Sequence, residues 1–250
     1  MPGTPVNARP VTTSLEIGWF GKLPCAGDFI YRRLPRTLLS GLDNWLQQGL
    51  SQLRGTYPAE WRDIYETAPT WNCAIPAAVT QVGHTLLGLI TPSRDRVGRE
   101  FPLCAGVAVP QGVAPTALLA SAHDWLQELG RLVAQAKARP TTVEAFDAAL
   151  SAIALPDPGR EQDGEGIGDI LSMLNMDDAS EDVPTIPMPL ARSLPWPDLP
   201  RIFDQRGLTS YWWTNTGAGG PLRGFTTDVG LAPSLMLTLM RPQFGAARRQ

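Results

Sequence analysis

A segment near the start of the chain, residues 18–35, is rich in glycine and proline and carries four charged residues that could contact a partner. They are Lys22, Asp28, Arg32 and Arg33. Glycine and proline set unusual backbone angles, and charged side chains on such a rigid loop are typical of a specific binding surface. Asp28 could instead cap the turn or pair with either arginine. We expect this segment to form or support a binding surface.

A second charged segment, residues 91–103, lies between two apolar stretches. Five of its residues are charged, namely Arg94, Asp95, Arg96, Arg99 and Glu100. The planar guanidinium of arginine can bind a carboxylate through two parallel hydrogen bonds, so the cluster can organise its own loop. A loop clamp held by ion pairs is favoured over a direct ligand site, and a contact surface for a partner remains the alternative.

Two adjacent tryptophans, Trp212 and Trp213, lie in the sequence Ser210–Thr214. Neighbouring residues of a strand point to opposite faces of a sheet, so each tryptophan would enter a different layer. We expect both to pack in the core rather than bind a ligand.

Residues that could carry catalysis are sparse. The two histidines, His84 and His123, stand in neither a Gly-x-Ser-x-Gly elbow nor a His-Glu-x-x-His helix. Cys25 or Ser93 could serve as the nucleophile of a small hydrolase, but only residue type supports them, and a structural thiol is expected at Cys25. The sequence therefore predicts no catalytic residue, no metal site and no cofactor.

The composition argues against several classes of protein. The chain has 250 residues, with 21 basic and 24 acidic side chains and a net charge of −3, which disfavours a general nucleic-acid-binding protein. No stretch approaches the roughly 18 apolar residues of a membrane span. The N-terminus lacks the basic-then-apolar order of a secretory signal. We expect a cytoplasmic protein with no nucleic-acid partner and no direct membrane insertion.

Hydrophobic periodicity predicts the elements that position these segments. Apolar residues at steps of three and four predict helices at about 36–53, 58–67, 118–133 and 141–153. Alternating or continuous apolar runs predict strands at about 15–20, 70–75, 85–91, 101–109, 208–214, 222–226 and 234–240. Gly55 is expected just past the end of the first helix, and Thr141 with Glu144 predicts a capping box. Short turns between the second, third and fourth strands indicate an antiparallel meander.

Residues 156–200 differ in composition from the rest of the chain. They hold eight of the 24 prolines, and residues 157–182 contain nine acidic residues and one basic residue. Such a composition is typical of a long surface insertion, with a short helix possible at 168–174. Residues 1–13 are expected to be a flexible leader. We predict an α/β fold for residues 14–250: one domain, a three-layer αβα sandwich around a mostly antiparallel sheet.

The charged segments and the tryptophan pair, taken together and in order, resemble the signatures of the TagF family, also called ImpM, of bacterial type VI secretion systems. The first motif holds Gly21, Lys22, Pro24, Gly27, Asp28 and Phe29; the second holds Ser93, Asp95, Arg96, Gly98, Arg99 and Phe101; the third holds Trp212 and Trp213. The resemblance extends from about Gly18 to Met240. The acidic insertion has no clear counterpart in the family.

The resemblance implies a regulatory function. TagF proteins are accessory factors that restrain type VI secretion after translation by engaging the forkhead-associated (Fha) protein of the apparatus. It also implies an αβα sandwich and a cytoplasmic location, with recruitment to the inner-membrane secretion complex and contacts to other cytoplasmic parts as open alternatives. Some members carry a PppA-type phosphatase domain, whose chemistry is not expected of this chain. A structural component of the same apparatus and a small hydrolase are the alternative functions.

Overall fold

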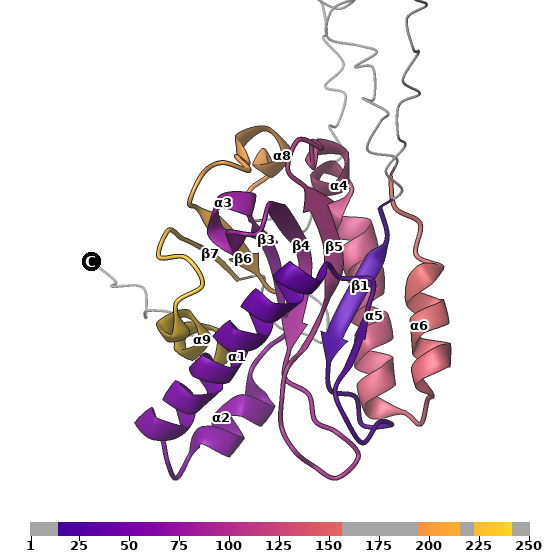
Figure 1. Cartoon of the computed structure of the whole chain (residues 1–250), viewed down its shortest axis with the longest axis vertical. Coiled ribbons are helices and arrows are strands. Elements are labelled where there is room, and N and C mark those ends of the chain that lie inside the picture. Colours follow the sequence, from indigo (N-terminus) through magenta and orange to yellow (C-terminus); the bar gives the residue numbers. More distant parts are fainter. Residues whose placement is uncertain (1–14, 157–194, 216–222, 242–250) are drawn as a thin grey trace, which may run out of the picture.

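A seven-stranded antiparallel sheet forms the centre of the computed structural model, which describes residues 15–156, 195–215 and 223–241 (Figure 1). The strands are β1 (Ile17–Gly21), β2 (Ile30–Arg32), β3 (Trp71–Ile75), β4 (His84–Thr91), β5 (Leu103–Pro110), β6 (Ser210–Trp213) and β7 (Gly224–Thr227). The helices are α1 (Arg36–Thr56), α2 (Trp61–Thr67), α3 (Ala77–Thr80), α4 (Thr116–Ala120), α5 (Ala122–Ala138), α6 (Val143–Ser151), α8 (Leu199–Ile202) and α9 (Pro233–Met240).

The strands lie in the order β2-β1-β5-β4-β3-β6-β7, and every neighbouring pair is antiparallel. The predicted meander is confirmed, because β3, β4 and β5 are consecutive in the chain and adjacent in the sheet. The N-terminal strand β1 then pairs with β5, while β6 from the C-terminal part pairs with β3. The meander therefore forms the centre of the sheet, and strands from distant parts of the chain extend the sheet at both of its edges.

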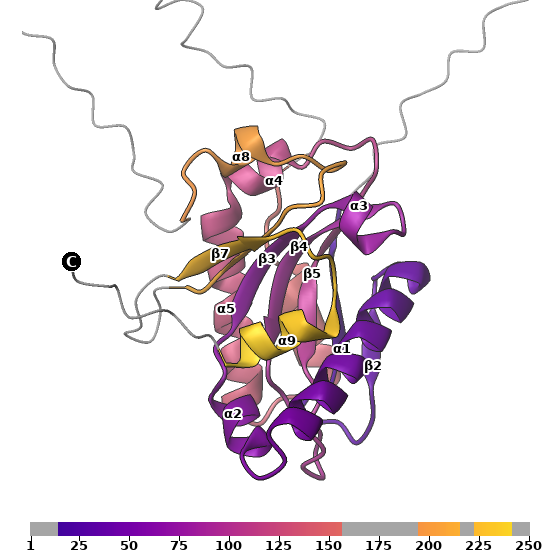
Figure 2. The same ribbon diagram turned by 90° about the vertical axis from the view of Figure 1, so that its left-hand side faces the viewer.

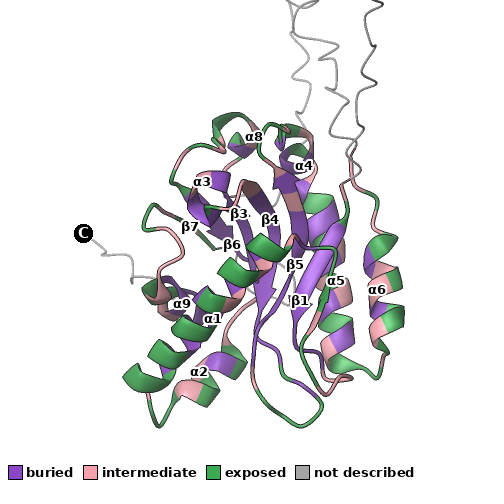
Figure 3. Cartoon of the chain, in the orientation of Figure 1, coloured by how far each residue is buried: buried purple, intermediate pink, exposed green. Residues whose placement is uncertain are grey.

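Helices cover both faces of the sheet, which confirms the predicted αβα sandwich (Figures 1 and 2). One face buries Ile17, Trp19, Val107 and Trp213 against α4, α5, α6 and α8. The period of two along the strands gives both faces an apolar surface, and Figure 3 shows the central strands largely buried and the outer sides of the helices exposed. The edge strands β2 and β7 are exposed or half-buried.

The second face buries Phe20, Trp71, Cys104 and Trp212 against α1, α2 and α9. Trp212 and Trp213 thus enter opposite layers, as the sequence predicts. Each of these indoles removes a large apolar area from water, and Trp212 also donates from Nε1 to Ser210 Oγ at 2.9 Å, so its polar group is satisfied.

Helix α1 follows the predicted apolar stripe and begins directly after Pro35. Proline is tolerated there because an N–H at the start of a helix has no acceptor within the helix. The end of α1 differs from the prediction: Gly55 lies inside the helix, which continues to Thr56. At Gly49 the helix approaches α9 so closely that a Cβ would overlap the side chain of Met236.

Three further expectations from the sequence are wrong in detail. Residues 234–240 form helix α9 rather than a strand; its buried residues Leu235, Met236, Leu239 and Met240 have helical spacing, and Pro233 favours a helix start. The predicted helix at 118–133 is interrupted at Ser121 into α4 and α5. The cap of α6 is Thr142, whose hydroxyl accepts from the N–H of Ala145, and not Thr141.

The predicted leader at 1–13, the possible helix at 168–174 and nearly all of the insertion at 156–200 lie outside the described residues. The single-domain organisation of residues 14–250 stays a prediction. Within the described residues, no helix combines the length and apolar character that crossing a membrane requires.

Candidate functional site

Two loops meet at one end of the sheet because β1 pairs with β5. Gly21, the last residue of β1, pairs with Leu103, the first residue of β5. The loop 22–29 leaves β1 after Gly21, and the loop 92–102 ends just before Leu103. Gly21 has a φ of +131°, and a Cβ there would overlap the carbonyl oxygen of Pro102, so the crossing of the two chains requires glycine. The antiparallel register thus brings the first two sequence motifs together.

The carboxylate of Asp95 is the centre of the paired loops. Its side chain is 0% exposed and lies 3.1 Å from Lys22 Nζ and 2.7 Å from Arg99 Nε. It also accepts from the backbone N–H groups of Val97 and Arg99, at 3.1 and 2.9 Å. Burial by itself raises the pKa of Asp95, but the hydrogen bonds from Arg99 and Lys22 outweigh it and hold the pKa well below its ordinary value. Asp95 therefore stays ionised and fixes both loops.

Further bonds join the two loops along their length. Arg99 donates through Nη2 to the carbonyl of Gly27 at 2.7 Å, and the backbone N–H of Arg96 donates to Ala26 at 2.8 Å. Gly98 adopts a φ of +86°, which favours glycine and lets the loop turn back over Asp95. Asp95 and Arg99 therefore form the ion-paired clamp that the sequence favoured. The loops 22–29 and 92–102, joined by Lys22, Asp95 and Arg99, are called the clamp below.

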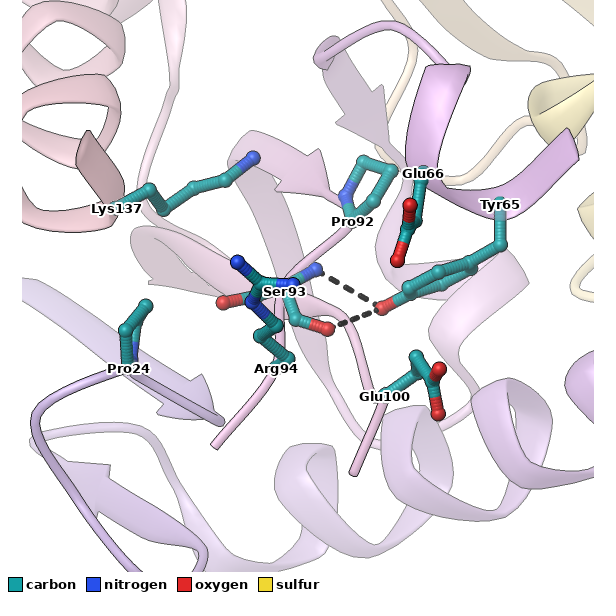
Figure 4. Close-up of a pocket in the computed structure, with 8 residues that line it drawn as sticks. All are labelled: Pro24, Tyr65, Glu66, Pro92, Ser93, Arg94, Glu100 and Lys137. Atoms are coloured by element: carbon teal, nitrogen blue, oxygen red, sulfur yellow. Dashed lines mark hydrogen bonds between the residues drawn. The ribbon is translucent and has the colours of Figure 1, made fainter. Parts of the chain in front are cut away.

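Helix α2 supports the same loop through Tyr65. The buried Tyr65 hydroxyl donates to the carbonyl of Ser93 at 2.8 Å and accepts from the Ser93 N–H at 2.9 Å (Figure 4). The Ser93 hydroxyl in turn donates to the carbonyl of Lys22 at 2.7 Å. Burial raises the pKa of Tyr65 far above its ordinary value, so the hydroxyl remains protonated and able to donate.

Aromatic and aliphatic side chains lie next to the clamp. Phe101 contacts Phe20 and Phe29 edge to face, with ring centroids 5.9 and 4.7 Å away, and Lys22 Nζ lies 4.8 Å from the centroid of Phe29. Phe29 nevertheless remains 47% exposed, Tyr31 49% and Val97 68%. The clamp therefore presents an apolar surface to solvent.

The remaining charged residues of the segment 18–35 lie in three different environments. Arg33 leaves the clamp and pairs with Asp147 of α6, with Nη2 2.7 Å from Oδ1, while Trp19 Nε1 donates to the same oxygen at 2.7 Å. Arg33 and Trp19 lower the pKa of Asp147, although burial opposes this. Asp28 accepts from the N–H of Phe29 at 2.8 Å and thus caps the turn, one of the two roles expected for it. Arg32 is exposed on β2.

A pocket of about 240 Å³ lies beside the clamp, where α2, α5 and both loops approach one another (Figure 4). Its lining residues are Pro24, Tyr65, Glu66, Pro92, Ser93, Arg94, Glu100 and Lys137. Lys137 reaches the pocket from the C-terminal part of α5, and its Nζ donates to Thr91 Oγ1 at 3.0 Å. Burial lowers the pKa of Lys137.

The possible nucleophiles lie in environments that do not activate them. Burial raises the pKa of Cys25 and Cys104 and raises that of Cys73 to about 12, which favours the neutral thiol over the reactive thiolate. His123 is exposed on α5, and His84 Nδ1 lies 3.0 Å from the carbonyl of Val82. Among the described residues, no three His, Cys, Asp or Glu side chains are grouped so that they could hold a metal ion.

The structure brings together most of the site residues expected from the sequence, namely Lys22, Ser93, Asp95, Arg96 and Arg99 with Pro24, Gly27, Gly98, Phe29 and Phe101. Sequence analysis missed Tyr65, Lys137 and Asp147. The hydroxyl of Tyr65 carried no sequence signal. Lys137 could have been noticed, because lysine is rare in a chain that otherwise uses arginine.

These features define an α/β sandwich protein whose sheet end carries two interlocked loops with a partly apolar, partly basic surface. The family model described as "TagF N-terminal domain, Type VI secretion system-associated" matches residues 18–153, more than half of the chain. The chain therefore belongs to the TagF family of type VI secretion-associated proteins. This confirms the resemblance to the TagF family; the matched residues contain the first two motifs and end before Trp212 and Trp213.

The fold is similar to that of a solved structure, the protein PA0076 from Pseudomonas aeruginosa. The two share 26% sequence identity with a TM-score of 0.64, and the similarity covers 94% of this chain and 98% of PA0076. No curated protein matches the sequence.

Proposed function

We propose that this chain restrains type VI secretion by binding the forkhead-associated protein of the secretion apparatus, without catalysing a reaction. Membership of a type VI secretion-associated family supports the process. The restraining role and the partner come from the family resemblance in the sequence. Binding requires no acid, base or nucleophile, and the protonated thiols and the engaged Ser93 hydroxyl agree with such a function.

One observation supports a location for the partner surface. Exposed apolar and basic side chains lie on β2, on the residue before it and on the loop 92–102. They are Phe29, Tyr31, Arg32, Arg96 and Val97, called here the β2 surface. Exposed large apolar side chains beside arginine are typical of residues that anchor protein complexes. Moreover, among the strands that the structure describes, β2 is an edge strand that pairs with β1 alone, so its outer backbone groups could also pair with a partner.

Arg96 and Arg99 differ in their roles, which matters for a test. Arg99 holds Asp95 and Gly27, so its removal disturbs the clamp. The Arg96 guanidinium has no ion pair within the described part of the chain, and its backbone N–H alone holds Ala26. Substitution of Arg96 therefore changes the surface while leaving the clamp bonds in place.

The experiment measures binding of the purified chain to the Fha protein by calorimetry. A micromolar complex has a binding free energy of about −8 kcal/mol, and a few aromatic and arginine anchors can supply most of it. Combined Tyr31→Ser and Arg96→Ala substitutions should weaken binding by at least tenfold. Arg131→Ala, which removes an exposed arginine paired with Glu128 on α5, is the matched control and should bind normally.

The outcomes separate the partner from the surface. Unchanged binding of the double variant rejects the β2 surface, whereas failure of the unmodified chain to bind rejects the partner. In cells, deletion of the gene should raise effector release. Loss of release would instead favour the alternative, a structural component of the apparatus.

A further inference from the structure

Lysine is rare in this chain, and both lysines lie at the clamp end of the sheet. Of 21 basic residues only Lys22 and Lys137 are lysines, and the others are arginines. Lys22 has a carboxylate partner, Asp95, at 3.1 Å. Lys137 makes no ion pair within the described part of the chain, and its Nζ donates to the neutral hydroxyl of Thr91.

A second cation lines the same pocket. Lys137 extends from α5 and Arg94 from the loop after β4, and both line the pocket (Figure 4). Arg94 takes part in the backbone bridge to Glu100, but its guanidinium has no ion pair among the residues that the structure describes. Two positively charged side chains thus line one partly open pocket.

The acidic residues of the pocket offset these cations only in part. Glu100 is already bound by Arg62, with Nε 2.7 Å from Oε1. Glu66 is exposed on α2 and has no ion pair in the described ranges. The lining holds two cations and two carboxylates, and Arg62, which binds Glu100 from outside the lining, brings the charge of the whole group to +1.

Partial burial makes the charge of Lys137 costly. Removal of water from an ammonium disfavours its charged form, and accordingly the pKa of Lys137 is lowered. A bound anion would restore the lost stabilisation, because charge-assisted hydrogen bonds from an ammonium and a guanidinium to one oxyanion are strong. The pocket of about 240 Å³ has room for such a group and for the atoms that carry it.

We propose that this pocket binds an oxyanion, the phosphate or carboxylate group of a ligand, between Lys137 Nζ and the guanidinium of Arg94. Thr91 positions the ammonium, and Tyr65 with Ser93 forms the fixed wall of the pocket. The pocket shares no lining residue with the β2 surface, so this proposal does not depend on the Fha protein being the partner.

The two-lysine composition allows a direct test on the full chain. Protein labelled with carbon-13 at lysine alone should give two Cε signals, assigned with a Lys137→Arg variant. Sodium phosphate and sodium acetate are titrated separately, with sodium chloride keeping the ionic strength constant. The Lys137 signal should move saturably, whereas the Lys22 signal should stay in place because Asp95 holds that ammonium.

Matched variants identify the second ligand group. Arg94→Ala should weaken anion binding by at least tenfold, while Arg131→Ala should leave it unchanged. Saturation with phosphate alone assigns a phosphoryl ligand, and saturation with acetate as well assigns a carboxylate. The proposal is overturned if neither anion moves the Lys137 signal beyond the effect of chloride, or if Arg94→Ala binds both as before.

Discussion

Removal of a single buried oxygen atom should destabilise the protein strongly at Tyr65. In Tyr65→Phe the Ser93 N–H loses its acceptor at 2.9 Å, and a buried unsatisfied N–H costs about 1–3 kcal/mol. The Ser93 carbonyl loses one donor at 2.8 Å but keeps the N–H of Phe101 at 3.0 Å, so this loss is smaller, about 0.5–1.5 kcal/mol. The expected total is about 1.5–4.5 kcal/mol, since the aromatic ring and its packing remain.

Urea unfolding measures this loss as a lower midpoint with an unchanged slope. Hydrogen exchange provides a local readout, because the Ser93 amide should exchange faster in the variant. Tyr31→Phe removes the same oxygen from a half-exposed ring and should change the stability by less than about 0.5 kcal/mol. Equal stability of Tyr65→Phe and the unmodified protein would refute the hydrogen-bonding argument.

Three further predictions concern the helix contact, the clamp and the thiols. In α1, Gly41→Ala should raise stability by about 0.5–1 kcal/mol, because a Cβ there meets no atom. Gly49→Ala should lower it by about 1–3 kcal/mol through overlap with Met236, and thermal unfolding checks whether the signs differ. The pKa of Asp95 is lower in the folded than in the unfolded state, so its stabilisation is present above about pH 4 and is lost as the pH falls further. The difference between the urea midpoints of Asp95→Asn and the unmodified protein should accordingly narrow as the pH falls below about 4, and a constant difference contradicts the assigned role. In thiol titration of the native protein, Cys25 alone should react, because the other two thiols are fully buried and react only after unfolding.

The sequence predicts the layers of this fold because periodicity reports burial directly. The apolar residues of α1 recur with helical spacing alone, and those around Trp19 alternate as in a strand; the structure confirms both elements. Residues 234–240 mislead because Leu235, Leu237 and Leu239 alternate while Leu235, Met236 and Leu239 also have helical spacing. Packing against α1 decides between these patterns, and that contact joins segments almost 200 residues apart.

The candidate site shows the same limit. Asp95 and Arg99 are four residues apart, so their pairing could be anticipated from the loop alone. The partners of Arg33 and Lys22 could not, because Asp147 and Asp95 lie 114 and 73 positions away and become neighbours only through the strand order. Physical reasoning from sequence identified the charged loops, but tertiary structure determines which charge meets which.

Strand β6 pairs with the edge of β3 that does not face β4. This placement has a practical consequence for work with fragments. A protein cut at the boundary of the family match, residue 153, would lack β6, β7 and α9. The backbone edge of β3 would then be bare, and Trp71 would lose its cover from Phe225 and the carbonyl of Leu239. Open apolar edges recruit other chains, so such a piece should accumulate as insoluble aggregates when expressed. Soluble production therefore calls for the last two strands and the final helix to be kept.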